Sequence, residues 1–213
     1  MQRHAWAPAP GPVRLGPALF AAAARADAGS LEPAPSGVAL AGLAAAASGT
    51  PVRVTSWTAW RREIRTRGPG LLVVLGHVEE VPGDRVLEIG RASDLSLADV
   101  GAAHVLRAGG APPLVVLVAC STALAADPFG SLHGAWLDHG AAAVVGTLAQ
   151  LNGVQGAEAT VALVSALREV AASGRDGGLG AAVTAARSAL LARGLLVGLL
   201  LISHGEIALE VAA

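Results

Sequence analysis

Two stretches of the sequence end on side chains that can do nucleophilic chemistry. An apolar run at residues 71–75 leads into Gly76 and His77, and a second run at residues 114–119 leads into Cys120, the only cysteine of the chain. A thiolate attacks an electrophilic carbon, while a nearby imidazole accepts the thiol proton and later returns it. If the two runs are neighbouring parallel strands, both side chains emerge at one edge of a sheet. The pattern therefore predicts a Cys-His pair.

Each of these residues also has a structural interpretation when taken alone. A free cysteine after a Leu/Val strand is commonly core packing, and a single histidine after a strand is commonly a structural residue. Their joint placement at two strand ends is what favours catalysis. The other histidines lack ligand spacing, and no glycine-rich phosphate loop follows a strand. We therefore expect no metal and no cofactor.

Alternating apolar runs and helical patterns surround the two stretches. Continuous Val/Leu strands separated by helices indicate an α/β fold, with a mostly parallel central sheet and helices on both faces. Strands are expected at residues 52–55, 71–75, 85–89, 114–119, 142–148, 195–202 and 207–211. Helices are expected at residues 57–67, 96–107, 130–139, 155–172 and 180–193.

The first 50 residues differ in amino-acid composition from the rest and are rich in alanine and proline. Residues 15–26 and 38–47 resemble Ala-rich helices, and a Pro-rich stretch at residues 32–37 separates them. We therefore expect a short helical and Pro-rich extension over residues 1–50, preceding a main domain over residues 51–213. Such a start also fits the end of a longer sensor region, so the chain can be a fragment of a larger protein.

Composition narrows the classes of partner. All 15 basic residues are arginine, the net charge is −1, and no dense basic run is present, so nucleic-acid binding is not expected. The longest apolar run, at residues 195–202, is far shorter than the roughly 20 residues that span a bilayer. Membrane insertion is therefore not expected. A single cysteine excludes an internal disulfide and fits a reducing, cytoplasmic location.

The order of these elements resembles the CHAT-domain family of caspase-like cysteine peptidases. The resemblance covers roughly residues 51–213, and its specific part is Gly76-His77 together with the PLVVLVACST stretch at residues 113–122. It implies a caspase-like fold with Cys120 as nucleophile and His77 as base. It also implies an oxyanion hole made by the backbone N–H groups of Cys120 and Val78. Val78 stands where the family usually has glycine.

The resemblance also implies a function. The chain would be a cysteine endopeptidase that cleaves a specific protein or peptide partner, in bacterial defence or regulated cell death, with an upstream sensor or activator protein. Two loops would shape substrate selection: one holds Asp127, whose carboxylate would attract a basic side chain, and the other holds Gln150 and Asn152.

Two alternatives remain open at this stage. A catalytically degenerate caspase-like scaffold would bind a partner without cleaving it; Val78 and the unusual loop at residues 149–153 favour this interpretation. An unrelated α/β hydrolase or binding domain, with Cys120 buried as packing, is the other.

Overall fold

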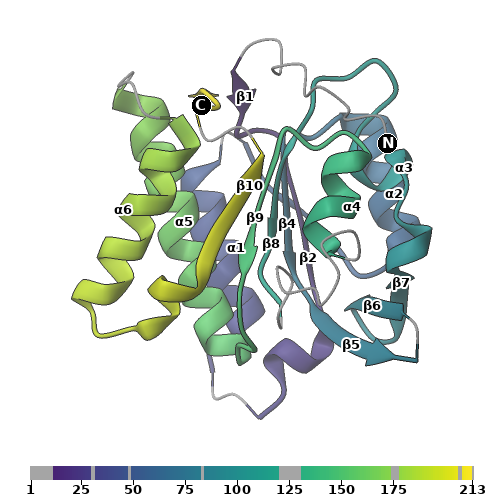
Figure 1. The fold of residues 1–213 in the computed structure, drawn as a ribbon, viewed down its shortest axis with the longest axis horizontal. Helices are drawn as coiled ribbons and strands as arrows, with labels where there is room; N and C mark the ends of the chain where they lie inside the picture. The colour runs from purple at the N-terminus through teal and green to yellow at the C-terminus, as the bar shows by residue number, and fades with distance from the viewer. Residues whose placement is uncertain are drawn as a thin grey trace, which may run out of the picture.

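A six-stranded sheet forms the centre of the molecule (Figure 1). The computed structural model describes residues 12–29, 32–47, 49–82, 84–119, 131–173, 178–205 and 208–212. Within these residues the strand order is β10-β9-β8-β4-β2-β3, and all neighbours are parallel except β10, which runs antiparallel to β9. The strands are β2 (Ala18–Ala22), β3 (Val52–Val54), β4 (Leu71–Leu75), β8 (Leu114–Leu117), β9 (Ala143–Thr147) and β10 (Leu201–Gly205).

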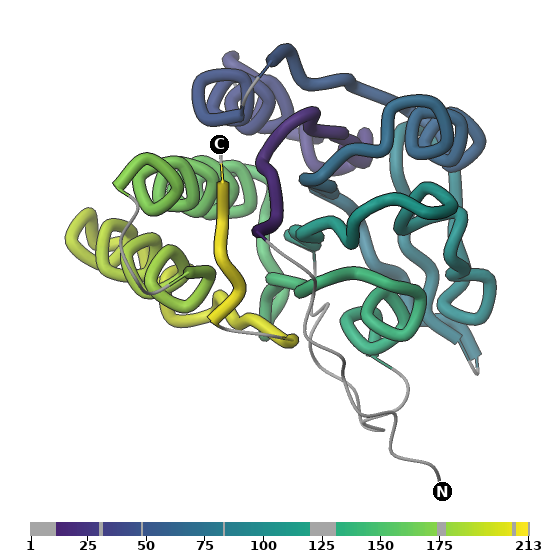
Figure 2. Tube along the Cα trace, turned by 90° about the horizontal axis from the view of Figure 1, so that it is seen from above, coloured from purple at the N-terminus to yellow at the C-terminus, as the bar shows by residue number. Residues whose placement is uncertain are grey.

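Helices cover both faces of this sheet, as expected (Figures 1 and 2). One layer contains α1 (Pro35–Ala46), α5 (Gly153–Ser173) and α6 (Gly178–Ala192), and the other contains α2 (Trp57–Arg67), α3 (Ala102–Val105) and α4 (Leu132–Asp138). Alternate residues of each strand enter opposite cores, because side chains of a strand point to alternating faces. In β4, Val73 packs on the α5 side and Val74 on the α2 side, and both are fully buried. The mostly parallel α/β architecture predicted from the sequence is thereby confirmed.

Two smaller sheets and three 3-10 helices complete the described structure. An antiparallel sheet is formed by β5 (His77–Val81), β6 (Asp84–Ile89) and β7 (Ser93–Ser96), and β1 (Val13–Arg14) pairs with β11 (Val211–Ala212). The 3-10 helices are η1 (Ala24–Asp27), η2 (Leu97–Asp99) and η3 (Leu196–Leu200).

The helix expected over residues 15–26 was wrong, because this segment contains β2 followed by η1. Alanine favours helix intrinsically, but pairing with a strand on each side overrides that weak preference. All five residues of β2 are buried between β3 and β4. Although β2 and α1 precede residue 50, they belong to the same sheet and the same core as the later elements.

Three other predicted elements differ from the structure, because a short sequence pattern was taken to span too many residues. The helix expected over residues 96–107 is two short pieces, because the Ser96 hydroxyl caps only η2 and the chain is extended again at Val100. The strand expected over residues 195–202 is mostly η3, and β10 begins only at Leu201. The strand expected over residues 207–211 is reduced to β11.

The α2 helix is well specified by its sequence. The Ser56 hydroxyl accepts a hydrogen bond from the Ala59 amide, and Gly68 ends the helix in the left-handed conformation. On the buried side, the Trp60 indole donates to the carbonyl of His104, with 2.8 Å between nitrogen and oxygen. This bond fixes α2 against α3. No helix of the described part of the chain is long and apolar enough to cross a bilayer.

His133 is a buried histidine of α4 whose ring nitrogens have no hydrogen-bond partner among the described residues. Burial, with a smaller contribution from neighbouring His204, lowers the pKa of His133 from 6.5 to about 3. Its ring lies 4.8 Å from the His204 ring, centroid to centroid. In the unfolded chain the same imidazole takes up a proton near its ordinary pKa, so acid favours unfolding.

We therefore predict that the free energy of unfolding falls as the pH drops below the ordinary histidine pKa and keeps falling towards the folded-state value of about 3. Between about pH 8 and about pH 5 the loss through this one group is about 2 kcal/mol. Urea unfolding at several pH values measures it. His133→Leu should flatten the profile, whereas His139→Asn, at an exposed position, should not. Parallel profiles for His133→Leu and the parent chain would contradict the prediction.

Candidate active site

The carboxyl ends of β4 and β8 lie side by side. The two strands are parallel, with Val74 opposite Leu117, and the Val118 amide donates to the Val74 carbonyl at 2.9 Å. On the other side of β8, the Thr147 hydroxyl of β9 donates to the carbonyl of Ala119. Residues that follow these strands therefore emerge at one edge of the sheet, which was the condition for a Cys-His pair.

A cavity of about 140 Å³ lies at this edge. It is formed where the ends of β4 and β8 meet η1 and the start of α5. Its lining includes Gly76, His77, Ala119, Arg25, Asn152 and Gly153. Segments far apart in the sequence are thus brought to one place.

His77 is the half-buried first residue of β5, and its imidazole contacts a guanidinium. The distance from Arg25 Nη1 to His77 Nε2 is 3.2 Å. Arginine only donates hydrogen bonds, so Nε2 must accept, and the ring proton of neutral His77 is then on Nδ1. Arg25 is in turn held by Glu88, a buried carboxylate of β6 whose Oε2 lies 3.3 Å from Arg25 Nε. His77 and Glu88 are also opposite each other in the β5–β6 pairing.

This contact bears on what His77 can do chemically. An imidazole whose Nε2 accepts from Arg25 has no free lone pair, so it cannot take a proton at that nitrogen. The side chain of Arg25 is 60% exposed, so water can replace its contact with the ring, and the guanidinium can turn away while it stays paired with Glu88. Nε2 of His77 then has a free lone pair at the cavity.

The start of α5 closes the cavity through a very close backbone contact. A Cβ on Gly153 would lie 1.7 Å from the carbonyl oxygen of Ala26, so only glycine allows α5 to approach η1 this closely. The neighbouring Asn152 caps the helix: its Oδ1 accepts from the Gln155 amide at 2.8 Å, and the Gln155 side chain accepts from the Asn152 amide at 3.2 Å. The α5 end is therefore locally fixed.

The remaining predicted site residues are distributed as follows. Val78 follows His77 in β5, is half-buried and pairs with Leu87. Gln150 is exposed and is not among the described residues that line the cavity, unlike Asn152. Cys120 and Asp127 lie outside the described residues. Ala119, which precedes Cys120 in the sequence, does line the cavity beside His77.

Arg25 and Glu88 were not predicted from the sequence as residues of the site. Arg25 follows the run ALFAA at residues 18–22; read as a strand, this run would have placed a charged residue at the carboxyl edge of the sheet. Glu88 is a lone carboxylate between Leu87 and Ile89 in a strand, and a buried carboxylate at such a position implies a charged partner.

The fold is similar to that of known cysteine proteinases. No protein-family model matches the chain, and no curated protein matches its sequence. Among solved structures it is similar to gingipain R, an Arg-specific cysteine proteinase, with a TM-score of 0.64 and 14% identity over 93% of this chain and 47% of that one. It is also similar to a complex of the pro- and mature domains of RgpB from Porphyromonas gingivalis, with a TM-score of 0.61 and 13% identity over 90% and 47% of the two chains.

The chain therefore spans about half (47%) of each of these proteins. At such low identity the likeness shows the fold alone: a caspase-like α/β fold. This removes the interpretation of the chain as an unrelated α/β hydrolase fold.

The Arg25–His77 contact predicts an unusual tautomer. In the ¹⁵N spectrum of histidine-labelled protein at alkaline pH, where the imidazole is neutral, His77 should show protonated Nδ1 and unprotonated Nε2. Arg25→Gln should shift the ring towards the Nε2-protonated form, because the fixed donor is gone. Arg91→Gln, which removes another exposed arginine, should leave the signals unchanged. A His77 ring protonated on Nε2 in the parent chain would contradict the contact.

The α5 approach predicts a pair of opposite glycine effects. Gly153→Ala should lower the free energy of unfolding by about 1–3 kcal/mol, because the new methyl group overlaps the Ala26 carbonyl. Gly37→Ala, in α1 with open space around it, should instead raise stability by up to about 1 kcal/mol. Urea denaturation of both variants measures the contrast. Equal effects of the two substitutions would show that α5 does not approach η1 so closely.

Proposed function

We propose that the chain is a cysteine endopeptidase of the caspase-like type that cleaves a specific protein partner. The observation that carries the proposal is the cavity at the carboxyl ends of β4 and β8, which is lined by His77 and by Ala119, the residue before Cys120. The caspase-like fold, and the sequence positions of His77 after β4 and Cys120 after β8, are separate reasons to propose the same chemistry.

In the proposed reaction, His77 takes the proton of the Cys120 thiol, and the thiolate adds to the scissile carbonyl carbon. The backbone N–H groups of Cys120 and Val78 donate to the resulting oxyanion. His77 then gives its proton to the leaving amine as the C–N bond breaks, leaving a thioester on Cys120. Water, deprotonated by His77, hydrolyses the thioester and restores the thiol.

Arg25 would control when His77 can act as the base in this reaction. Its guanidinium occupies Nε2 of His77 in the free protein, so binding of substrate or an activator must displace it before that nitrogen can accept a proton. Glu88, which is nearly buried, gives the displaced arginine a fixed carboxylate to remain on.

The resemblance to the CHAT-domain family adds a compartment, a biological role and a partner to the proposed function. These are a cytoplasmic bacterial protein, a role in defence or regulated cell death, and an upstream sensor or activator. Asp127, Gln150 and Asn152 would contribute to substrate selection, with Asp127 favouring a basic side chain. The gingipain R neighbour is described as an Arg-specific cysteine proteinase, which supports peptidase chemistry for this fold but gives no substrate for this chain.

A non-catalytic scaffold is the second candidate. It is favoured by the Arg25–His77 contact, which leaves Nε2 without a free lone pair, and by Val78 in the position where the family usually has glycine. The two candidates differ in whether Cys120 is chemically activated.

Covalent labelling separates them. A peptidyl thiol-directed electrophile should modify Cys120 of the native chain, as detected by mass spectrometry, and Cys120→Ala should take up none. His77→Ala should slow labelling by about a hundredfold or more, because general-base assistance is lost. His139→Ala, at an exposed histidine, should label at the parent rate.

Cleavage of proteins encoded beside this chain then tests the peptidase itself. A partner that is cut by the parent chain and left intact by Cys120→Ala supports the proposal. Labelling at equal rates in the parent and His77→Ala proteins, together with a Cys120→Ala protein that keeps its full biological effect, would establish the scaffold instead.

A further inference from the structure

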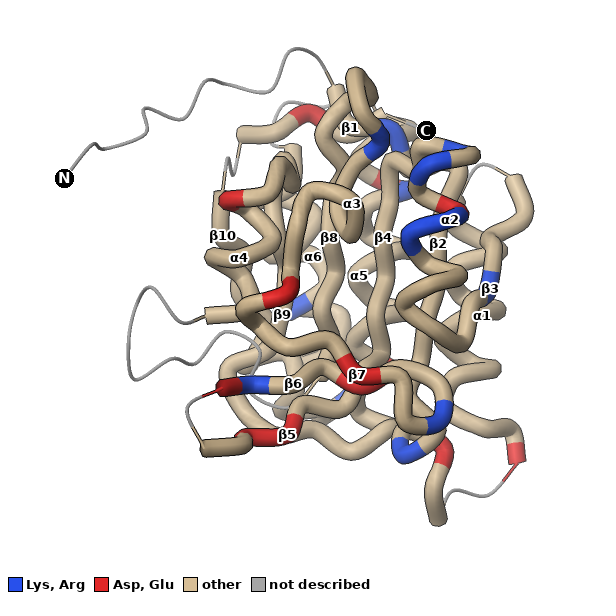
Figure 3. The backbone as a smooth tube through the Cα atoms, turned by 90° about the vertical axis from the view of Figure 1, so that its right-hand side faces the viewer, with Lys and Arg blue, Asp and Glu red and all other residues tan. Residues whose placement is uncertain are grey.

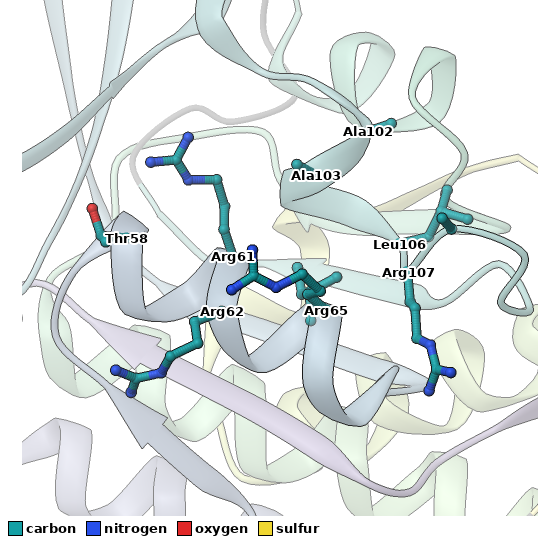
Figure 4. A pocket seen from close by; sticks show the side chains of 10 residues that line it. Thr58, Arg61, Arg62, Arg65, Ala102, Ala103, Leu106 and Arg107 are labelled. Atoms are coloured by element: carbon teal, nitrogen blue, oxygen red, sulfur yellow. The ribbon is translucent and has the colours of Figure 1, made fainter.

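A second, larger hollow lies on the opposite side of the sheet from α5, between α2 and α3 (Figure 4). Its volume is about 670 Å³, and it shares no lining residue with the cavity at His77. Apolar side chains form much of its lining, including Ile64, Leu106 and Ala103. We call this hollow the α2–α3 groove.

Arginines surround the α2–α3 groove. Arg61, Arg62 and Arg65 come from α2, and Arg107 follows α3 (Figure 4). All four are exposed. Only Arg62 has a carboxylate partner within the described ranges, Glu63, at 3.1 Å between Nη2 and Oε1.

This charge is concentrated on a protein whose net charge is −1. The α2 helix carries four arginines and one glutamate, a balance of +3, while several acidic residues gather on β5–β7 (Figure 3). Like charges one turn apart, such as Arg61 and Arg65, destabilise a helix by about 0.2–0.5 kcal/mol. The arrangement therefore opposes folding slightly and favours an anionic partner. Burial and the nearby Arg61 both lower the pKa of His104, consistent with a positive field here.

The α2–α3 groove is also preformed. Trp57 and Trp60 bury the core side of α2, and the bond from the Trp60 indole to the His104 carbonyl ties the two helices together. A partner that enters the groove finds rigid walls, so binding does not require the helices to be ordered first.

We propose that the α2–α3 groove binds an acidic amphipathic helix of a partner protein. Apolar side chains spaced by three and four residues would enter the floor beside Ile64 and Leu106, and carboxylates flanking them would pair with Arg61, Arg65 and Arg107. The 11 residues of α2 extend about 16 Å, which matches three turns of such a helix. The apolar floor favours this occupant over single-stranded nucleic acid, whose bases stack on aromatic side chains, because the groove lining contains no aromatic residue among the described residues.

Binding of designed peptides tests the assignment without using any peptidase activity. The probe is a fluorescein-labelled peptide of about 15 residues with leucines on one helical face and glutamates on the other. Two matched peptides replace either the glutamates by lysine or the leucines by serine. Fluorescence polarisation with the full chain should show binding of the first peptide alone, weakening as salt is added.

Substitutions in the α2–α3 groove locate the binding. The double variant Arg61→Glu/Arg65→Glu should weaken binding by about tenfold or more, and Ala103→Trp should weaken it by filling the floor. Arg168→Glu reverses one charge on α5, half the change of the double variant, and should have no effect. Circular dichroism spectra that match the parent would show that each variant is folded.

Three results would overturn the assignment. They are equal binding of the lysine peptide, equal loss with Arg168→Glu, and unchanged binding in both groove variants. Binding of duplex DNA or phosphatidylserine vesicles that the double variant abolishes, without binding of the acidic peptide, would also overturn it. Failure of this test leaves Cys120 labelling unaffected, so it is distinguishable from failure of the proposed peptidase.

Discussion

The parallel pairing of β4 with β8 is the constraint on which the rest of the structure depends. Its register sets Val74 opposite Leu117, so the two strands end level with each other. A slip of β8 by one residue would exchange the faces of all its side chains, because the side-chain period of a strand is two. Val116 would then leave the α5 core for the α2 core, and the contacts of β8 with both helix layers would be lost. The register of β4 and β8 therefore determines both the packing of the two helix layers and the position of the cavity.

Much of this arrangement could be read from the sequence. The Leu/Val runs at residues 71–75 and 114–119 are long, apolar and bounded by glycine and proline, so their identity as buried parallel strands did not depend on tertiary information. The placement of His77 at the end of the first run followed directly. The α2 helix was likewise predicted at its true bounds, because its tryptophans recur at helical spacing.

The rest depended on contacts that no local pattern contains. An Ala-rich stretch such as ALFAA is compatible with helix or strand, and only the strands on either side decide between them. For that reason Arg25, the partner of His77, was not predicted from the sequence. The approach of α5 to η1 depends on a single missing Cβ at Gly153, and one glycine among 27 has no signature of its own.

The inner position of β2 has a consequence for how the molecule is assembled. β3 reaches the sheet only through β2, and β4 has β2 as one of its two neighbours. The first strand of the sheet to leave the ribosome is therefore one that cannot pair until β3 and β4 have been made, some 30 to 50 residues later. Contacts this distant in sequence slow folding, since loop-closure entropy must be overcome before any strand pair forms. Arg25 comes three residues after the end of β2, so it can take its position beside His77 only after β2 has paired with these later strands.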